Sequence, residues 1–234
     1  MLFRDREEAG VRLAEKLAGL RGRDPLILAV PRGAVVLGDV LARELDGDLD
    51  VVLVHKLGAP GEPELAIGAV DEEGRVFLDE NAAALGVDED YIRRESQAQL
   101  AMLRKRRSLY TPARPPLSPA GRLTVVVDDG VATGASMIVA LGAVRRRRPA
   151  RLVAATAVMP PPTLARIAEA ADEVVCLELP PQFRAVGQFF ADFTQVSDDE
   201  VIALLRASAA RRPPGWSPHP EPATEPGPED PPCC

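Results

Sequence analysis

The residues of this chain with the clearest chemical potential are two adjacent aspartates, Asp128 and Asp129, in the stretch VVVDDGVATGAS (125–136). Three valines precede the pair, and a turn flanked by glycines follows it. In open α/β sheets, ligands bind beyond the carboxyl ends of the strands, and the amides of a tight turn before a helix bind phosphate. Because carboxylates would repel that phosphate, we expect the aspartates to bind sugar hydroxyls or a metal-bridged diol. The pattern therefore predicts a site for a ribose 5-phosphate.

The expected phosphate-binding turn places several main-chain N–H groups around one concavity, and its hydroxyl side chains add donors. Its residues are Gly130, Val131, Ala132, Thr133, Gly134, Ala135 and Ser136. A Walker A loop would need a lysine where Ala135 follows Gly134, and the dinucleotide-binding G-x-G-x-x-G spacing is absent. The alternative is an ordinary strand-to-helix turn with solvated aspartates. The combination of an acidic pair, a threonine and flanking glycines favours the binding function.

The elements that must position this turn follow from the hydrophobic pattern. Short apolar runs predict buried strands at 26–30, 51–54, 123–127, 151–158 and 173–178. Helical spacing of apolar residues predicts helices from about residue 9 to 20 and at 34–45, 81–109, 135–147, 163–170 and 198–210. Two short extended pieces, 65–70 and 75–78, are expected around the turn 71–74. Alternating strands and helices predict an α/β fold with an open, mostly parallel sheet flanked by helices.

Composition limits the function further. A formal net charge of -7 over 234 residues argues against nucleic-acid binding, and no apolar run approaches the length of a membrane span. Two histidines and three cysteines form no metal-binding motif, so no direct protein cage for a metal is expected. We expect a cytoplasmic protein with one domain over 1–211. Nine prolines in the last 22 residues predict a disordered tail at 212–234.

The stretch 125–136 resembles the phosphoribosyl pyrophosphate (PRPP) binding motif of type I phosphoribosyltransferases. The resemblance extends to DREEAG (5–10), VPRGAVVLG (30–38), HKLGAPGEPELAIGAV (55–70) and AVGQFFADFTQVSDDEV (185–201), and covers roughly 3–208. These stretches are similar to a bacterial branch of uncharacterised phosphoribosyltransferases, some of them fused to hydrolase-like domains. The resemblance implies a Mg²⁺-dependent pentosyltransferase that moves the 5-phosphoribosyl group of PRPP to a small nitrogenous base and releases pyrophosphate. The family typically forms homodimers.

The same resemblance assigns further residues. Asp128 and Asp129 would hold the ribose hydroxyls as catalytic residues, and the turn would hold the 5-phosphate. Pyrophosphate would be bound by Lys56, also counted as catalytic, and by the loop Pro31, Arg32 and Gly33. The PRPP pyrophosphate would bring the Mg²⁺ with it. Without the resemblance, a solvated strand-end lysine would explain Lys56 almost as well.

Two segments are expected to cover the site. Residues of about 57–80, rich in glycine and proline, would form a mobile flap that excludes water. A hood at about 180–195 contains four phenylalanines, and we expect Phe183 and Phe189 to stack on the base. The alternative for this hood is a small core that ties the last helix to the sheet. The basic runs 104–107 and 145–148 are expected to be solvated helix ends.

One departure from the family's sequence pattern limits which bases could be the acceptor. In 6-oxopurine transferases an aspartate that acts as a base precedes the loop threonine, whereas this chain has Ala132 there. The loop is therefore more similar to those of adenine or orotate enzymes. Ala132 also keeps open a function of another class, a PRPP-binding regulatory protein with the same fold and no transferase activity.

Overall fold

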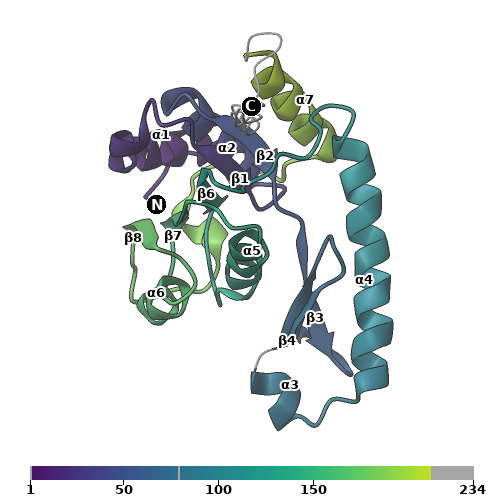
Figure 1. The fold of residues 1–234 in the computed structure, drawn as a ribbon. Coiled ribbons are helices and arrows are strands. Elements are labelled where there is room, and N and C mark those ends of the chain that lie inside the picture. The colour runs from purple at the N-terminus through teal and green to yellow at the C-terminus, as the bar shows by residue number, and fades with distance from the viewer. Residues whose placement is uncertain (1, 79, 212–234) are drawn as a thin grey trace, which may run out of the picture.

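The computed structural model of the protein describes residues 2–78 and 80–211. The predicted tail at 212–234 lies outside these residues. The main sheet contains five parallel strands in the order β2-β1-β6-β7-β8. They are β1 (Leu26–Ala29), β2 (Asp48–Val51), β6 (Leu123–Asp128), β7 (Arg151–Val158) and β8 (Glu173–Glu178). The predicted α/β fold with a parallel sheet flanked by helices is confirmed (Figure 1).

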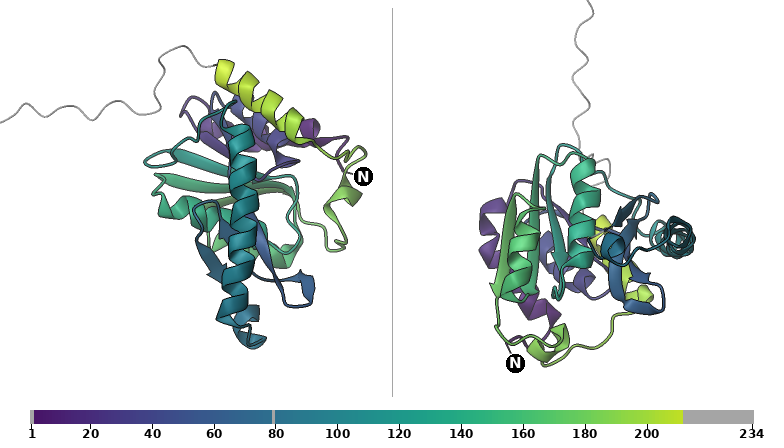
Figure 2. Two further views of the ribbon diagram at one scale, coloured as in Figure 1. Left: turned by 90° about the vertical axis from the view of Figure 1, so that its right-hand side faces the viewer. Right: turned by 90° about the horizontal axis from the view of Figure 1, so that it is seen from below.

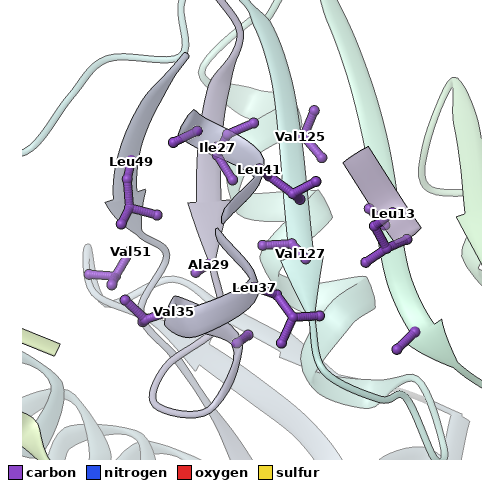
Figure 3. Close-up of a cluster of buried hydrophobic side chains, with 14 of the residues drawn as sticks. Leu13, Ile27, Ala29, Val35, Leu37, Leu41, Leu49, Val51, Val125 and Val127 are labelled. Carbon is purple, nitrogen blue, oxygen red and sulfur yellow. The ribbon is translucent and has the colours of Figure 1, made fainter. Parts of the chain in front are cut away.

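Helices cover both faces of this sheet, and the alternating side chains of each strand explain why. They are α1 (Arg6–Lys16), α2 (Ala34–Glu44), α5 (Ala135–Arg146), α6 (Pro161–Ala168) and α7 (Asp198–Ala210), and a short 3-10 helix, η1 (Ala18–Leu20), follows α1. On one face, side chains such as Ile27 and Val127 pack against Leu37 of α2 and Leu13 of α1 (Figure 3). The opposite face packs on α5. Because both faces are buried, the three inner strands β1, β6 and β7 consist largely of apolar residues.

A second, smaller sheet follows β2 and is antiparallel. It contains β3 (Val54–Ala59), β4 (Glu62–Asp71) and β5 (Val76–Leu78) in that order. This sheet lies between α5 and the long helix α4 (Glu89–Tyr110), which runs along the outside of the molecule (Figures 1 and 2). The short helix α3 (Glu80–Ala84) connects the small sheet to α4. The two extended pieces expected at 65–70 and 75–78 are therefore the strands β4 and β5.

The expected strand at 51–54 is wrong in its bounds. β2 runs over Asp48–Val51, and Val54 already begins β3 of the other sheet. Acidic residues such as Asp48 and Asp50 are untypical of a buried strand, yet both side chains are buried. Arginines from distant parts of the chain pair with them, and Arg114 donates to Asp48 at 2.6 Å. Long-range ion pairs of this kind leave no local pattern in the sequence.

Two further expectations change for the region 54–110. The stretch expected as a glycine- and proline-rich loop forms the hairpin of β3 and β4, which turns at Gly61 with a φ of 79°. The helix expected over 81–109 is divided into α3 and α4. The division falls at Gly86, whose φ is 57°, and at Asp88, whose side chain accepts a hydrogen bond from the amide of Asp90 as the N-cap of α4.

The basic run 104–107 is not simply a solvated helix end. Arg107 is only 13% exposed and donates to Asp50 of β2 at 3.1 Å, to the carbonyl of Val51 at 2.9 Å, and to Glu72 at 2.6 Å. It therefore connects α4 to the main sheet and to the turn between β4 and β5. Within residues 2–78 and 80–211, none of the helices has both the length and the apolar character that crossing a bilayer requires.

Candidate functional site

The loops that follow β1 and β6 meet at the carboxyl edge of the main sheet. The two strands are neighbours, with Ala29 opposite Val127, and the amide of Val30 donates to the carbonyl of Val127 at 3.0 Å. The contact between the loops is closest at Gly33. A Cβ atom on Gly33 would lie 2.3 Å from Oδ2 of Asp129. The predicted pyrophosphate loop and the predicted acidic pair are therefore in direct contact, and only glycine fits between them.

Arg6, at the start of α1, holds Asp129 from the other side. Its Nε donates to Oδ2 of Asp129 at 2.7 Å, and the two side chains are only 10% and 12% exposed. Its Nη1 donates to the carbonyl of Thr194 at 2.8 Å, and its guanidinium lies 3.9 Å from the ring centroid of Phe193. Sequence reasoning did not assign Arg6 a role. In the sequence, the only indication of a role for Arg6 is its place in the stretch DREEAG, because its partner Asp129 lies 123 positions away.

The environment of the acidic pair favours protonation. Removal from solvent raises the pKa of Asp128 well above its ordinary value, and repulsion from Asp129 raises it further. Burial also raises the pKa of Asp129, although the Arg6 guanidinium opposes that shift. Asp128 also accepts a hydrogen bond from the amide of Asp129 at 2.9 Å. Perturbed carboxyl groups at the edge of a parallel sheet are typical of functional sites.

The predicted phosphate-binding turn is fixed at its back by β7 and α6. The amide of Val131 donates to the carbonyl of Val158 at 2.9 Å, and the hydroxyl of Thr163 donates to the carbonyl of Ala132 at 2.8 Å. Gly134 has a φ of 86°, which favours glycine and turns the chain into α5. The first amides of α5 have no partners within the helix. The local geometry therefore has the features expected of an anion-binding turn.

The hood packs directly over the start of this turn. A Cβ on Gly130 would lie 2.3 Å from Val186, in the short 3-10 helix η2 (Val186–Phe189). The ring centroids of Phe183 and Phe189 are 5.3 Å apart. Phe189 is only 7% exposed, whereas Phe183 is half-buried. Of the two predicted stacking residues, Phe183 is thus the more exposed.

The start of the chain binds the hood to the main domain. Phe3 forms an isolated parallel bridge with Phe190, and the amides of Leu2 and Phe3 both donate to the carbonyl of Phe189 at 2.9 Å. The rings of Phe3 and Phe190 lie 5.2 Å apart. The hood phenylalanines therefore also form a small core with the start of the chain, whereas the structural alternative named the last helix and the sheet as the parts that such a core would join.

The remaining predicted residues lie on either side of this centre. Arg32 lies in the loop after β1, and its Nη1 is 3.7 Å from Oδ2 of Asp198 at the start of α7. Lys56 does not end the second strand of the main sheet, as expected, but lies within β3, opposite Ala69 of β4. The ring Nδ1 of the neighbouring His55 lies 2.8 Å from the carbonyl of Lys56.

The structure therefore brings the acidic pair, the turn, the loop 31–33 and the hood together, and places Lys56 on the adjacent hairpin. Among the described residues, no cluster of three or more His, Cys, Asp or Glu side chains is arranged to hold a metal ion.

The chain is similar to known proteins over most of its length. Residues 4–194 match the family described as the phosphoribosyl transferase domain. Two Mycobacterium tuberculosis proteins that are provisionally named phosphoribosyl transferases, MT0597 of strain CDC 1551 / Oshkosh and Rv0571c of strain ATCC 25618 / H37Rv, are each 42% identical over 205 residues. These matches cover 87% of this chain but 46% of each relative, so the chain spans about half the length of the curated relatives.

A solved structure is similar over nearly its whole length. The crystal structure of TT1426 from Thermus thermophilus shares 47% sequence identity with this chain, with a TM-score of 0.78. The similarity covers 88% of this chain and 99% of that one. The similarity to this structure thus extends over most of this chain and nearly all of the other.

Proposed function

Because the chain belongs to the phosphoribosyl transferase domain family, we propose that it transfers the 5-phosphoribosyl group of PRPP to a nitrogenous acceptor of the nucleobase class and releases pyrophosphate. In this pentosyl transfer the bond from C1 of the ribose to the pyrophosphate oxygen breaks, and a bond from C1 to an acceptor nitrogen forms. One observation carries the proposal: the loop 31–33 touches the acidic pair at Gly33. A single ligand with a pyrophosphate next to a ribose would contact both.

In this proposal the turn over 130–136 binds the 5-phosphate. The first amides of α5 point toward the helix N-terminus, where the helix dipole favours an anion. Thr133 and Ser136 add hydroxyl donors. The bonds from Val131 to β7 and from Thr163 to Ala132 keep the turn in shape before the ligand arrives, so little ordering is required on binding.

Asp128 and Asp129 hold the ribose hydroxyls and favour positive charge on the ring. The transition state of such a transfer resembles an oxocarbenium ion, as in glycoside hydrolysis. Carboxylates placed beside the sugar stabilise that charge more strongly in a site removed from water. Arg6 holds Asp129 in one orientation through the 2.7 Å ion pair, which leaves the less constrained Asp128 as the closer partner of the sugar.

Arg32, Lys56 and the amides of the loop 31–33 bind the pyrophosphate that leaves. Pro31 and Gly33 shape the loop, and Arg32 supplies a guanidinium suited to phosphate oxygens. When bound, Mg²⁺ would neutralise part of the charge on the pyrophosphate. The donor set fits this arrangement, because Asp129 is paired with Arg6 and the ion would be held mainly by phosphate oxygens.

The acceptor would bind under the hood, against the half-buried ring of Phe183. The buried ring of Phe189 contacts Phe183 at a centroid distance of 5.3 Å. Ala132 takes the position of the acidic base of 6-oxopurine enzymes, so adenine-like or orotate-like acceptors are expected to react better than hypoxanthine. A role in nucleotide metabolism and the homodimeric assembly that the resemblance implies belong to the same proposal, as does the cytoplasmic location expected from the composition.

The test is pyrophosphate release from PRPP and Mg²⁺ with a panel of nucleobases. We expect release with at least one acceptor, and loss of that release in the double variant Asp128→Asn, Asp129→Asn. If the double variant keeps full activity, the role of the acidic pair is wrong. If PRPP binds but no acceptor gives release, the protein is a PRPP-binding regulatory protein. If calorimetry detects no binding of PRPP, the proposal fails altogether.

A further inference from the structure

Asp198, the first residue of α7, gathers side chains from two other parts of the chain. Nη1 of Arg32 lies 3.7 Å from one carboxylate oxygen, and Nε of Arg106 lies 3.8 Å from the other. The hydroxyl of Tyr110 donates to Asp198 as well. The group is possible because the C-terminal end of α4 reaches the N-terminal end of α7 (Figure 1). We call these four residues the Asp198 cluster.

The Asp198 cluster carries an excess of positive charge. Two guanidinium groups face one carboxylate, and each side chain of these three residues remains about one-third exposed, at 30%, 31% and 34%. Burial and the hydrogen bond to Asp198 raise the pKa of Tyr110, so this residue stays a neutral donor. An anion entering here would meet two cations and would complete the charge balance.

The two arginines are held near Asp198 by charge and not by hydrogen bonds. Charge-assisted hydrogen bonds of guanidinium groups are about 2.7–2.9 Å long, as in the pair of Arg6 and Asp129 at 2.7 Å. The distances of 3.7 and 3.8 Å in the Asp198 cluster exceed that range. A phosphate with several oxygens would make closer contacts to both guanidinium groups than Asp198 does.

The position of the Asp198 cluster links it to the proposed site. Arg32 is the neighbour of Gly33, and Gly33 touches Asp129. A ligand that extends from the acidic pair along the loop 31–33 therefore approaches Arg32 and then Arg106. This direction is the one that the pyrophosphate of PRPP would take.

We propose that Arg106 of α4 is a second arginine for the pyrophosphate group, and that Asp198 is an internal anion that keeps Arg32 and Arg106 together before the ligand binds. The proposal rests on the proposed function, and it adds to that function a residue from a helix outside the main sheet. The sequence alone did not separate Arg106 from its basic neighbours, because all four residues of the run 104–107 carry the same charge.

The neighbours of Arg106 on α4 provide a matched control. Lys105 is exposed and carries the same charge one residue away. Arg107 is unsuitable, because it is bound to Asp50 and Glu72 and its loss would disturb the fold. The variants to compare are therefore Arg106→Gln and Lys105→Gln in the full chain.

The test measures binding of magnesium pyrophosphate and, separately, of ribose 5-phosphate by calorimetry. A lost charge-assisted contact should raise the Kd for pyrophosphate about tenfold in Arg106→Gln. Lys105→Gln should stay within about twofold of the unchanged protein, since an exposed charge contributes little. The affinity for ribose 5-phosphate should be the same in all three proteins, because the turn over 130–136 is untouched.

The outcomes separate this proposal from the one on which it rests. If the unchanged protein binds pyrophosphate and both variants bind it equally well, Arg106 has no such role. If Arg106→Gln weakens ribose 5-phosphate binding as much as pyrophosphate binding, the effect is a general displacement of α4 and the proposal is overturned. If the unchanged protein binds neither PRPP nor pyrophosphate, the proposed function itself is wrong.

Discussion

At the scale of single residues, the acidic pair consists of two chemically different carboxyl groups. Asp129 is fixed by Arg6 on one side and by Gly33 on the other. Asp128 forms no such ion pair within the described part of the chain, and both burial and Asp129 raise its pKa. The sequence predicted the pair and its turn, because both lie in one continuous stretch. It did not predict Arg6, since only the fold brings residues 6 and 129 together.

The raised pKa of Asp128 has a consequence for stability. A carboxyl group whose pKa is higher in the folded than in the unfolded protein favours folding while it is protonated. As the pH rises through the folded pKa, ionisation costs free energy and that contribution is lost. At neutral pH, Asp128→Asn should therefore stabilise the protein, by about 1 kcal/mol, and raise the Tm by roughly 2–4 °C, while phosphoribosyl transfer is lost.

Thermal unfolding of both proteins from pH 4 to pH 8 checks this prediction. The difference in Tm should shrink toward acidic pH, where Asp128 is protonated in both the folded and unfolded forms. Asp172→Asn is a useful contrast, because the hydrogen bond from Arg145 lowers the pKa of that exposed carboxyl group. An Asp128→Asn protein that is less stable at neutral pH would contradict the assigned environment.

At the scale of elements, Arg107 is the main connection between α4, β2 and the small sheet. It contacts Asp50 of β2 and Glu72 of the turn after β4 in one nearly buried group. Removing one partner of a buried ion pair leaves an uncompensated charge. Burial already raises the pKa of Asp50 despite the nearby Arg107. Without Arg107, the buried Asp50 carboxylate would therefore bear the free-energy cost of an unpaired charge.

Arg107→Gln should lower the free energy of unfolding by about 3–5 kcal/mol, as measured by urea denaturation. Arg104→Gln, an exposed position three residues earlier on α4, should change it by less than about 0.5 kcal/mol. Adding Asp50→Asn to Arg107→Gln should recover part of the loss, because the unpaired charge is then removed. Equal effects of Arg104→Gln and Arg107→Gln would show that the buried pairing does not stabilise the fold.

Strand β2 shows why the position of one strand was predicted wrongly from the sequence. Apolar patterning marks strands that bury hydrocarbon, and the strands β1, β6 and β7 follow it. β2 instead buries Asp48 and Asp50, and their arginine partners lie beyond residue 100. The pattern rule therefore chose the four apolar residues at 51–54. Strand β3 was missed and β4 was expected too short for a related reason, because these segments contain glycine and proline, which are depleted in strands.

At the scale of the whole molecule, the fold class, the parallel sheet and the place of the turn could be predicted from the sequence. Alternating apolar runs and helices determine these features locally. The contacts that complete the site could not be predicted, because they join distant segments: Arg6 to Asp129, Arg106 to Asp198, and Val186 over Gly130. A single sequence carries no direct signal for such contacts.

Two arginines hold the end of the small sheet that contains the turn between β4 and β5. Asp71 accepts a hydrogen bond from Arg146 of α5 at 2.9 Å, and that guanidinium lies 4.1 Å from the ring centroid of Phe77. Arg107 holds the neighbouring Glu72. At the opposite end, residues 60–62 of the turn are exposed, and Tyr91 of α4 donates to the carbonyl of Gly58 at 2.9 Å just before the turn. If the hairpin is a flap, its motion should be confined to the exposed turn beyond Gly58.

Hydrogen exchange with and without magnesium and PRPP tests this division. Amides of about 60–65 should exchange more slowly in the complex, because closure of this exposed turn over the ligand would remove them from solvent. Amides of 69–78 should change little, since Arg146 and Arg107 hold that end in both states. A uniform change in exchange over the whole hairpin would contradict this division and would place the hinge at the end held by Arg146 and Arg107. No change anywhere in the hairpin would mean that it does not close, and that Lys56 meets the pyrophosphate without any flap movement.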